Sequence, residues 1–148
     1  MKPIPNEIFF AWVEEEMAAG RSVTFRLKGN SMYPLLRDGR DDVVLRPCAG
    51  EELRPMDVVL FRYKGKHLLH RIMRIDGDRL YIQGDGSVVA REECLYSDVV
   101  GKVQAVVRPS GRTIPTSSWK WRVPSCLWRK SGMLRIFLLK VSFKLRRM

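Results

Sequence analysis

Two side chains of this 148-residue sequence could together carry out acyl transfer: Ser31 and His70. Ser31 lies in residues 29–34, Gly-Asn-Ser-Met-Tyr-Pro, which favour a tight turn that exposes the hydroxyl and lets the serine amide point at a developing oxyanion. His70 has a reference pKa of about 6.5, so its neutral ring could accept the serine proton at physiological pH. Plainer roles remain open, because most serines in such turns bond their own backbone and a lone strand histidine is more often structural. The other histidine, His67, is expected to be solvated.

Short segments with strand periodicity surround these two residues. Apolar and polar residues alternate, or β-branched residues cluster, between turns rich in Gly, Asp and Lys. The predicted strands cover residues 23–27, 43–45, 58–61, 68–75, 80–83 and 99–107. Many short strands with close turns indicate a mainly β fold, an antiparallel, barrel-like domain over residues 21–108.

A helix is expected before this domain, within residues 1–20. Asn6 can cap it, and Phe9, Trp12 and Val13 would form its inward face. After the domain, residues 109–148 are predicted to be a linker followed by a basic amphipathic helix at the C-terminal end.

The order of the motifs along the chain is a more specific signal of function than any single motif. The serine box is followed by Asp-Gly-Arg-Asp-Asp-Val-Val-Leu, Pro-Met-Asp-Val-Val-Leu-Phe, His-Arg-Ile, Gly-Asp-Gly-Ser and Val-Val-Gly-Lys-Val, at residues 38–45, 55–61, 70–72, 84–87 and 99–103. This series resembles the superfamily that joins type I signal peptidases with the peptidase domains of LexA-type repressors. Histidine at the base position is similar to the signal peptidases of the endoplasmic reticulum, archaea and some sporulating bacteria.

The resemblance implies roles for individual residues. Ser31 would be the nucleophile, its N–H would help to hold the oxyanion, and His70 would be the base. The family's usual second oxyanion donor, a serine two positions earlier, is Gly29 here. The acid of histidine-type relatives has no clear counterpart, because an ungapped count places Arg91 there, with Glu92 and Glu93 beyond. Asp85 could orient His70, or it could bond turn amides or pair with Arg71.

Charge is divided unevenly along the chain. The formal net charge is +11, from 27 Lys and Arg against 16 Asp and Glu, but every acidic residue lies at or before Asp98. Residues 119–148 carry tryptophans among basic side chains, and on a helix Leu134, Leu138, Val141 and Leu145 would share one stripe. This composition fits an anionic membrane surface or a helix docked on its own domain, and both remain open.

Other classes are disfavoured by composition. Three scattered cysteines make neither a disulfide framework nor a metal site, so we expect reduced thiols, no metal and no cofactor. An acidic run at residues 14–16 argues against a signal peptide, and no segment has the roughly 20 apolar residues of a spanning helix. We therefore expect a cytoplasmic protein. If residues 119–148 meet a membrane, they would do so peripherally, at its inner face.

Three functions follow. The first is a serine endopeptidase that cleaves a signal or leader segment from a peptide or preprotein through Ser31 and His70. The second is a catalytically silent peptide-binding module of the same fold. The third is a membrane- or nucleic-acid-associated protein that uses the basic tail. Nucleic acid is not the expected partner, because the body is nearly neutral and the tail is rich in Trp and apolar residues.

Overall fold

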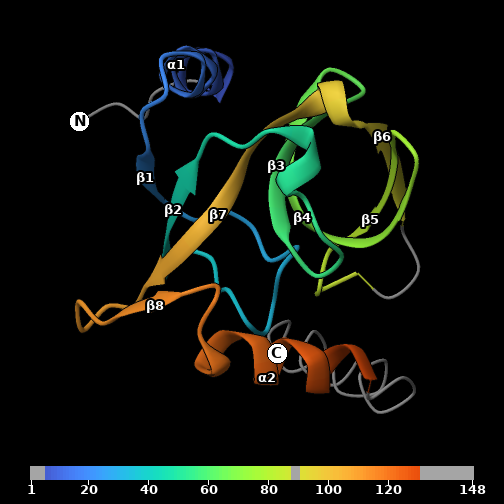
Figure 1. Cartoon of the computed structure of the whole chain (residues 1–148). Coiled ribbons are helices and arrows are strands. Elements are labelled where there is room, and N and C mark those ends of the chain that lie inside the picture. The colour runs from blue at the N-terminus through green and yellow to red at the C-terminus, as the bar shows by residue number, and fades with distance from the viewer. Residues whose placement is uncertain (1–5, 88–90, 131–148) are drawn as a thin grey trace, which may run out of the picture.

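In residues 6–87 and 91–130, which the computed structural model describes, eight strands form one antiparallel sheet with a helix on either side of them in the chain (Figure 1). The strands are β1 (Val23–Arg26), β2 (Asp42–Arg46), β3 (Val58–Tyr63), β4 (Lys66–Asp76), β5 (Arg79–Gln83), β6 (Glu92–Leu95), β7 (Val99–Val107) and β8 (Thr113–Pro115). The helices are α1 (Asn6–Ala18) and α2 (Trp119–Lys130), and short 3-10 turns span Gly50–Glu52 and Tyr96–Asp98. The expected mainly β, antiparallel class with flanking helices is confirmed.

The sheet has two halves that meet at β7 and β3. Its strand order is β1-β2-β7-β3-β4-β5-β6, and β8 pairs with β7 outside this path. The half made by β3 to β6 curls round, and β6 comes back into contact with β3 (Figure 1). One apolar core, around Phe61, Ile72 and Leu80, fills this curl. The other, around Val13, Met32 and Leu45, lies between α1, β1, β2 and β7.

The hairpin of β3 and β4 positions His70. Its turn contains Lys64 and Gly65, both with positive φ, and Val59 pairs with His70 across the hairpin. Because side chains alternate across a strand, Leu69 and His70 point to opposite faces of the sheet. Leu69 accordingly joins the core under α1, while His70 lies on the face that contacts β6.

Helix α1 is oriented differently from the prediction. Val13 and Met17, one helical turn apart, form its buried face, and Phe9 is half-buried. Trp12 was expected to point inward, but 46% of its surface is exposed, so that part of the prediction is wrong.

Part of the predicted linker and tail belongs to the folded body. Residues 113–115 form β8, in which Ile114 is buried and pairs with Val106 of β7. Helix α2 follows and buries Trp121 and Ser125 against the sheet. For residues 119–130 the structure therefore has a helix docked on its own domain. The predicted stripe of Leu134, Leu138, Val141 and Leu145 lies outside the described residues.

Candidate active site

Ser31 is exposed in the turn that follows β1. Gly29 opens this turn with a φ of +85°, a left-handed conformation that glycine adopts without strain, and its N–H donates to Oδ1 of Asp38 at 2.6 Å. The next side chain, Met32, is fully buried and anchors the turn. The hydroxyl of Ser31 donates to the carbonyl oxygen of Leu69, the residue before His70, at 3.5 Å.

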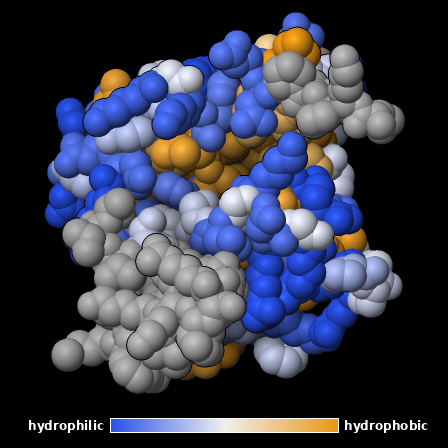
Figure 2. Space-filling view, turned by 180° about the vertical axis from the view of Figure 1, so that it is seen from behind, coloured by the Kyte–Doolittle hydropathy of each residue, from blue (hydrophilic) through white to orange (hydrophobic). Residues whose placement is uncertain are grey.

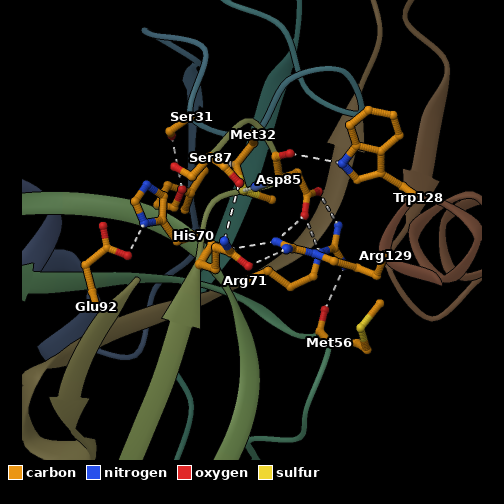
Figure 3. A network of polar contacts seen from close by, with 12 residues as sticks. Ser31, Met32, Met56, His70, Arg71, Asp85, Ser87, Glu92, Trp128 and Arg129 are labelled. Atoms are coloured by element: carbon orange, nitrogen blue, oxygen red, sulfur yellow. Dashed lines mark hydrogen bonds and ion pairs between the residues drawn. The ribbon is translucent and has the colours of Figure 1, made fainter. Parts of the chain in front are cut away.

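His70 is buried, with 4% of its surface exposed. Its Nδ1 lies 3.2 Å from Oε2 of Glu92 on β6, and the edge of the Phe61 ring packs against it. Figure 3 shows the imidazole between Ser31 and Glu92. If Nδ1–H donates to the carboxylate, the lone pair of Nε2 stays available on the other side of the ring.

The Gly-Asp turn brings the serine and the histidine to the same place. The N–H of Gly86 donates to the carbonyl oxygen of Ser31 at 2.8 Å. A methyl group on Gly84 would collide with that same oxygen and would lie 3.2 Å from Nε2 of His70. Gly84 therefore fills the narrow space between the two candidate residues. Ser31 and His70 are not hydrogen-bonded to one another here, which is common before a substrate aligns the groups.

Opposing influences act on the pKa of His70. Burial lowers the pKa below its ordinary value of 6.5, while the negative charge and hydrogen bond of Glu92 act in the opposite direction. The net direction is downward, so the ring is neutral near pH 7. A neutral imidazole with a free Nε2 is the form that can accept a proton.

Asp85 lies in a separate, fully buried ion cluster. Its carboxylate contacts Nε and Nη2 of Arg71 at 2.9 and 2.8 Å, and Nη2 of Arg129 at 2.7 Å (Figure 3). The indole N–H of Trp128 donates to the backbone carbonyl oxygen of Asp85 at 2.9 Å. The sequence left open whether Asp85 orients His70 or pairs with Arg71. In the structure Asp85 pairs with Arg71, and the carboxylate that contacts His70 belongs to Glu92.

Three residues that contact His70 or the turn at Asp85 were not predicted from the sequence. Glu92 was noted only as lying beyond Arg91, because β6 was not predicted and its pairing with β5 was unknown. Arg129 and Trp128 were placed in the basic tail, for which a membrane surface and a docked helix both remained open, and the structure has both side chains bound to the turn at Asp85. No local sequence signal indicates that contact, since more than 40 residues separate the partners.

Among the described residues, no three His, Cys, Asp or Glu side chains are grouped so that they could hold a metal ion. Within the same part of the chain, neither helix has the length and apolar character needed to cross a membrane. Comparison of the sequence with protein-family models and with curated proteins finds no match.

Proposed function

We propose that this chain is a serine endopeptidase with a signal-peptidase/LexA-like fold, which cleaves a signal or leader segment from a peptide or preprotein. The observation that carries the proposal is the buried His70, whose Nδ1 contacts Glu92 and whose Nε2 faces the turn of Ser31, with burial lowering the pKa of the ring. A histidine held by a carboxylate beside an exposed serine is the arrangement that activates a hydroxyl nucleophile.

The proposed reaction has two stages. Oγ of Ser31 attacks the carbonyl carbon of the scissile peptide bond while its proton passes to Nε2 of His70. The tetrahedral intermediate collapses, the C–N bond breaks, and His70 returns the proton to the leaving amine. Water then attacks the acyl-serine with His70 again as base, which releases the carboxylate product and restores Ser31. Glu92 would hold the ring and stabilise its charged form.

The oxyanion would be held mainly by the backbone. In the described part of the chain, the N–H of Ser31 donates no hydrogen bond, so it is available to the oxyanion. Gly29 offers no side chain, and its N–H is occupied by Asp38. One donor in place of two would lower the rate by about 10²–10³-fold.

The lack of a second oxyanion donor also favours a second function, that of a peptide-binding module without catalysis. A module that holds a peptide without cutting it would need neither the second donor nor a hydrogen bond between Ser31 and His70. The two functions differ in one outcome, namely whether an acyl-serine forms.

Candidate leader peptides incubated with the full chain test the peptidase, with products followed by mass spectrometry. Cleavage should disappear in Ser31→Ala and persist in Ser22→Ala, a control at an exposed serine before β1. A Ser31→Ala protein that cleaves as well as the parent would refute the proposal.

We further propose that the outer face of α2 meets an anionic membrane surface from the cytoplasmic side. Trp119, Val123 and Leu127 recur every four residues and are 70%, 48% and 66% exposed, with Lys120 and Lys130 on the same helix. An exposed apolar stripe beside basic side chains suits a lipid interface. Flotation with phosphatidylserine vesicles tests this, and a Trp119→Ser/Leu127→Ser double variant that floats equally well would contradict it.

A further inference from the structure

An apolar pocket lies between α1 and the sheet. It has a volume of about 400 Å³, and Ser31 is one of the residues that line it. Its apolar walls include Phe9 and Phe10 of α1, Phe25 of β1, Leu60 of β3 and Leu69 of β4. Figure 2, which shows the molecule from behind, has apolar surface gathered in a recess that hydrophilic side chains surround.

Helix α1 forms one wall of the pocket. Phe10 stacks on the ring of His67, with ring centres 4.7 Å apart, and Phe9 packs edge-on against Phe25. Glu14 binds both His67, at 2.9 Å, and Arg62, at 2.7 Å, and so ties the helix to the β3–β4 hairpin. His67 was expected to be solvated, but it is half-buried and forms part of the pocket wall.

The size of the pocket bears on what it can hold. A small side chain such as that of alanine fills a space similar to one water molecule, about 30 Å³, so it would leave most of this volume unfilled. A Leu or Phe side chain would contact the aromatic walls and remove them from water, which favours binding by roughly tenfold or more over alanine.

The neighbouring strand suggests how a ligand would lie. β1 is at one end of the sheet and has one strand neighbour, β2, within the described residues. An extended peptide can add to such an edge through its backbone, and alternate side chains then enter pockets. Lys28 is exposed just beyond the end of β1 and lines the same recess, which favours an acidic side chain nearby, whereas Arg26 is already paired with Asp42.

We propose that this pocket binds a bulky apolar side chain of an extended peptide substrate, next to the bond that Ser31 attacks. The proposal rests on the proposed function for the identity of that bond, although the pocket itself can be tested without cleavage. Helix α1 is thereby a specificity element, and Phe10 is a residue that selects the substrate.

The test uses the full chain with Ser31→Ala, so that binding is measured in the absence of cleavage. Immobilised octapeptides carry Ala, Leu, Phe or Trp at one fixed position, with the other positions randomised, and the bound fluorescently labelled protein is quantified. Leu, Phe and Trp should exceed Ala by about tenfold at one or two positions. Equal binding of all four, a preference for Ala, or no binding would overturn the proposal.

A matched pair of second substitutions assigns the preference to the pocket. Phe10→Gln places a polar group on the wall and should abolish the preference, whereas Ile8→Gln, at a 63% exposed position of the same helix, should retain it. Circular dichroism checks that both remain folded. Retained preference in Phe10→Gln would contradict the assignment. A dimer in sedimentation that Phe10→Gln dissociates would also contradict it, because a second copy would then occupy the pocket.

Binding and cleavage can fail separately. If selected peptides bind Ser31→Ala but the unsubstituted chain leaves them uncut, the proposed pocket is supported and the proposed peptidase function is refuted.

Discussion

Replacing Asp85 with asparagine should destabilise the protein strongly, because it removes the charge shared by two buried arginines. The carboxylate is fully buried, the side chains of Arg71 and Arg129 are 1% and 6% exposed, and three nitrogen–oxygen contacts of 2.7–2.9 Å join them. Removing one partner from a buried ion cluster costs about 3–5 kcal/mol, since the remaining charges are left uncompensated. Asparagine also leaves the two guanidinium groups to repel one another at close range.

The assay is urea unfolding followed by circular dichroism, with Tm as a second measure. For a chain of this length, a loss of that size corresponds to a fall of about 10–15 °C in Tm. The matched control is Glu93→Gln, which removes a carboxylate from the exposed pair with Arg79, whose side chains are 55% and 52% exposed. That pair should contribute less than about 1 kcal/mol. If Asp85→Asn costs no more than Glu93→Gln, the assignment of Asp85 to a stabilising ion cluster is refuted.

Three further predictions concern the proposed catalytic centre. Glu92→Gln should lower kcat and move the acidic limb of the pH–rate profile to lower pH, because Glu92 raises the pKa of His70 against the effect of burial; a limb that stays in place would contradict this. In the unsubstituted enzyme, kcat/KM should rise with pH and reach half its plateau below pH 6.5, whereas a midpoint well above that value would oppose His70 as the base. Gly84→Ala should abolish cleavage and cost about 1–3 kcal/mol in urea unfolding, because its methyl group collides with the Ser31 carbonyl; unchanged activity would show that this contact does not position Ser31.

Much of the fold could be predicted from periodicity. Strand β7 has the predicted bounds, and β2 to β5 each extend the predicted segments by at most a few residues. Strand β6 was missed because Glu-Glu-Cys-Leu has no clear alternation, and its pairing with β5 is a tertiary contact. Strand β8 was missed because it has three residues, ends in proline and follows a Pro-Ser-Gly segment that is typical of a linker.

In the candidate site, too, some residues could be predicted from the sequence and others depend on tertiary contacts. Ser31 and His70 were singled out because the motifs around them follow one another in a recognisable order, and the structure places both beside Gly84. The carboxylate on His70 could not be assigned locally, because it depends on how β4, β5 and β6 align. The contacts of Arg129 and Trp128 with Asp85 could not be predicted, because the basic, aromatic composition of α2 suits a lipid surface as well as a buried ion cluster.

Covalent labelling of Ser31 by a fluorophosphonate tests the proposed chemistry most directly. The probe loses fluoride as Oγ bonds to phosphorus, and peptide mapping by mass spectrometry locates the adduct without any knowledge of the substrate. We predict a single adduct on Ser31 of the full chain, absent in Ser31→Ala, strongly slowed in His70→Gln, and formed faster as the pH rises through the pKa of His70. An unlabelled Ser31 in the folded protein, or labelling that is equally fast in His70→Gln, would contradict the proposed Ser31–His70 mechanism.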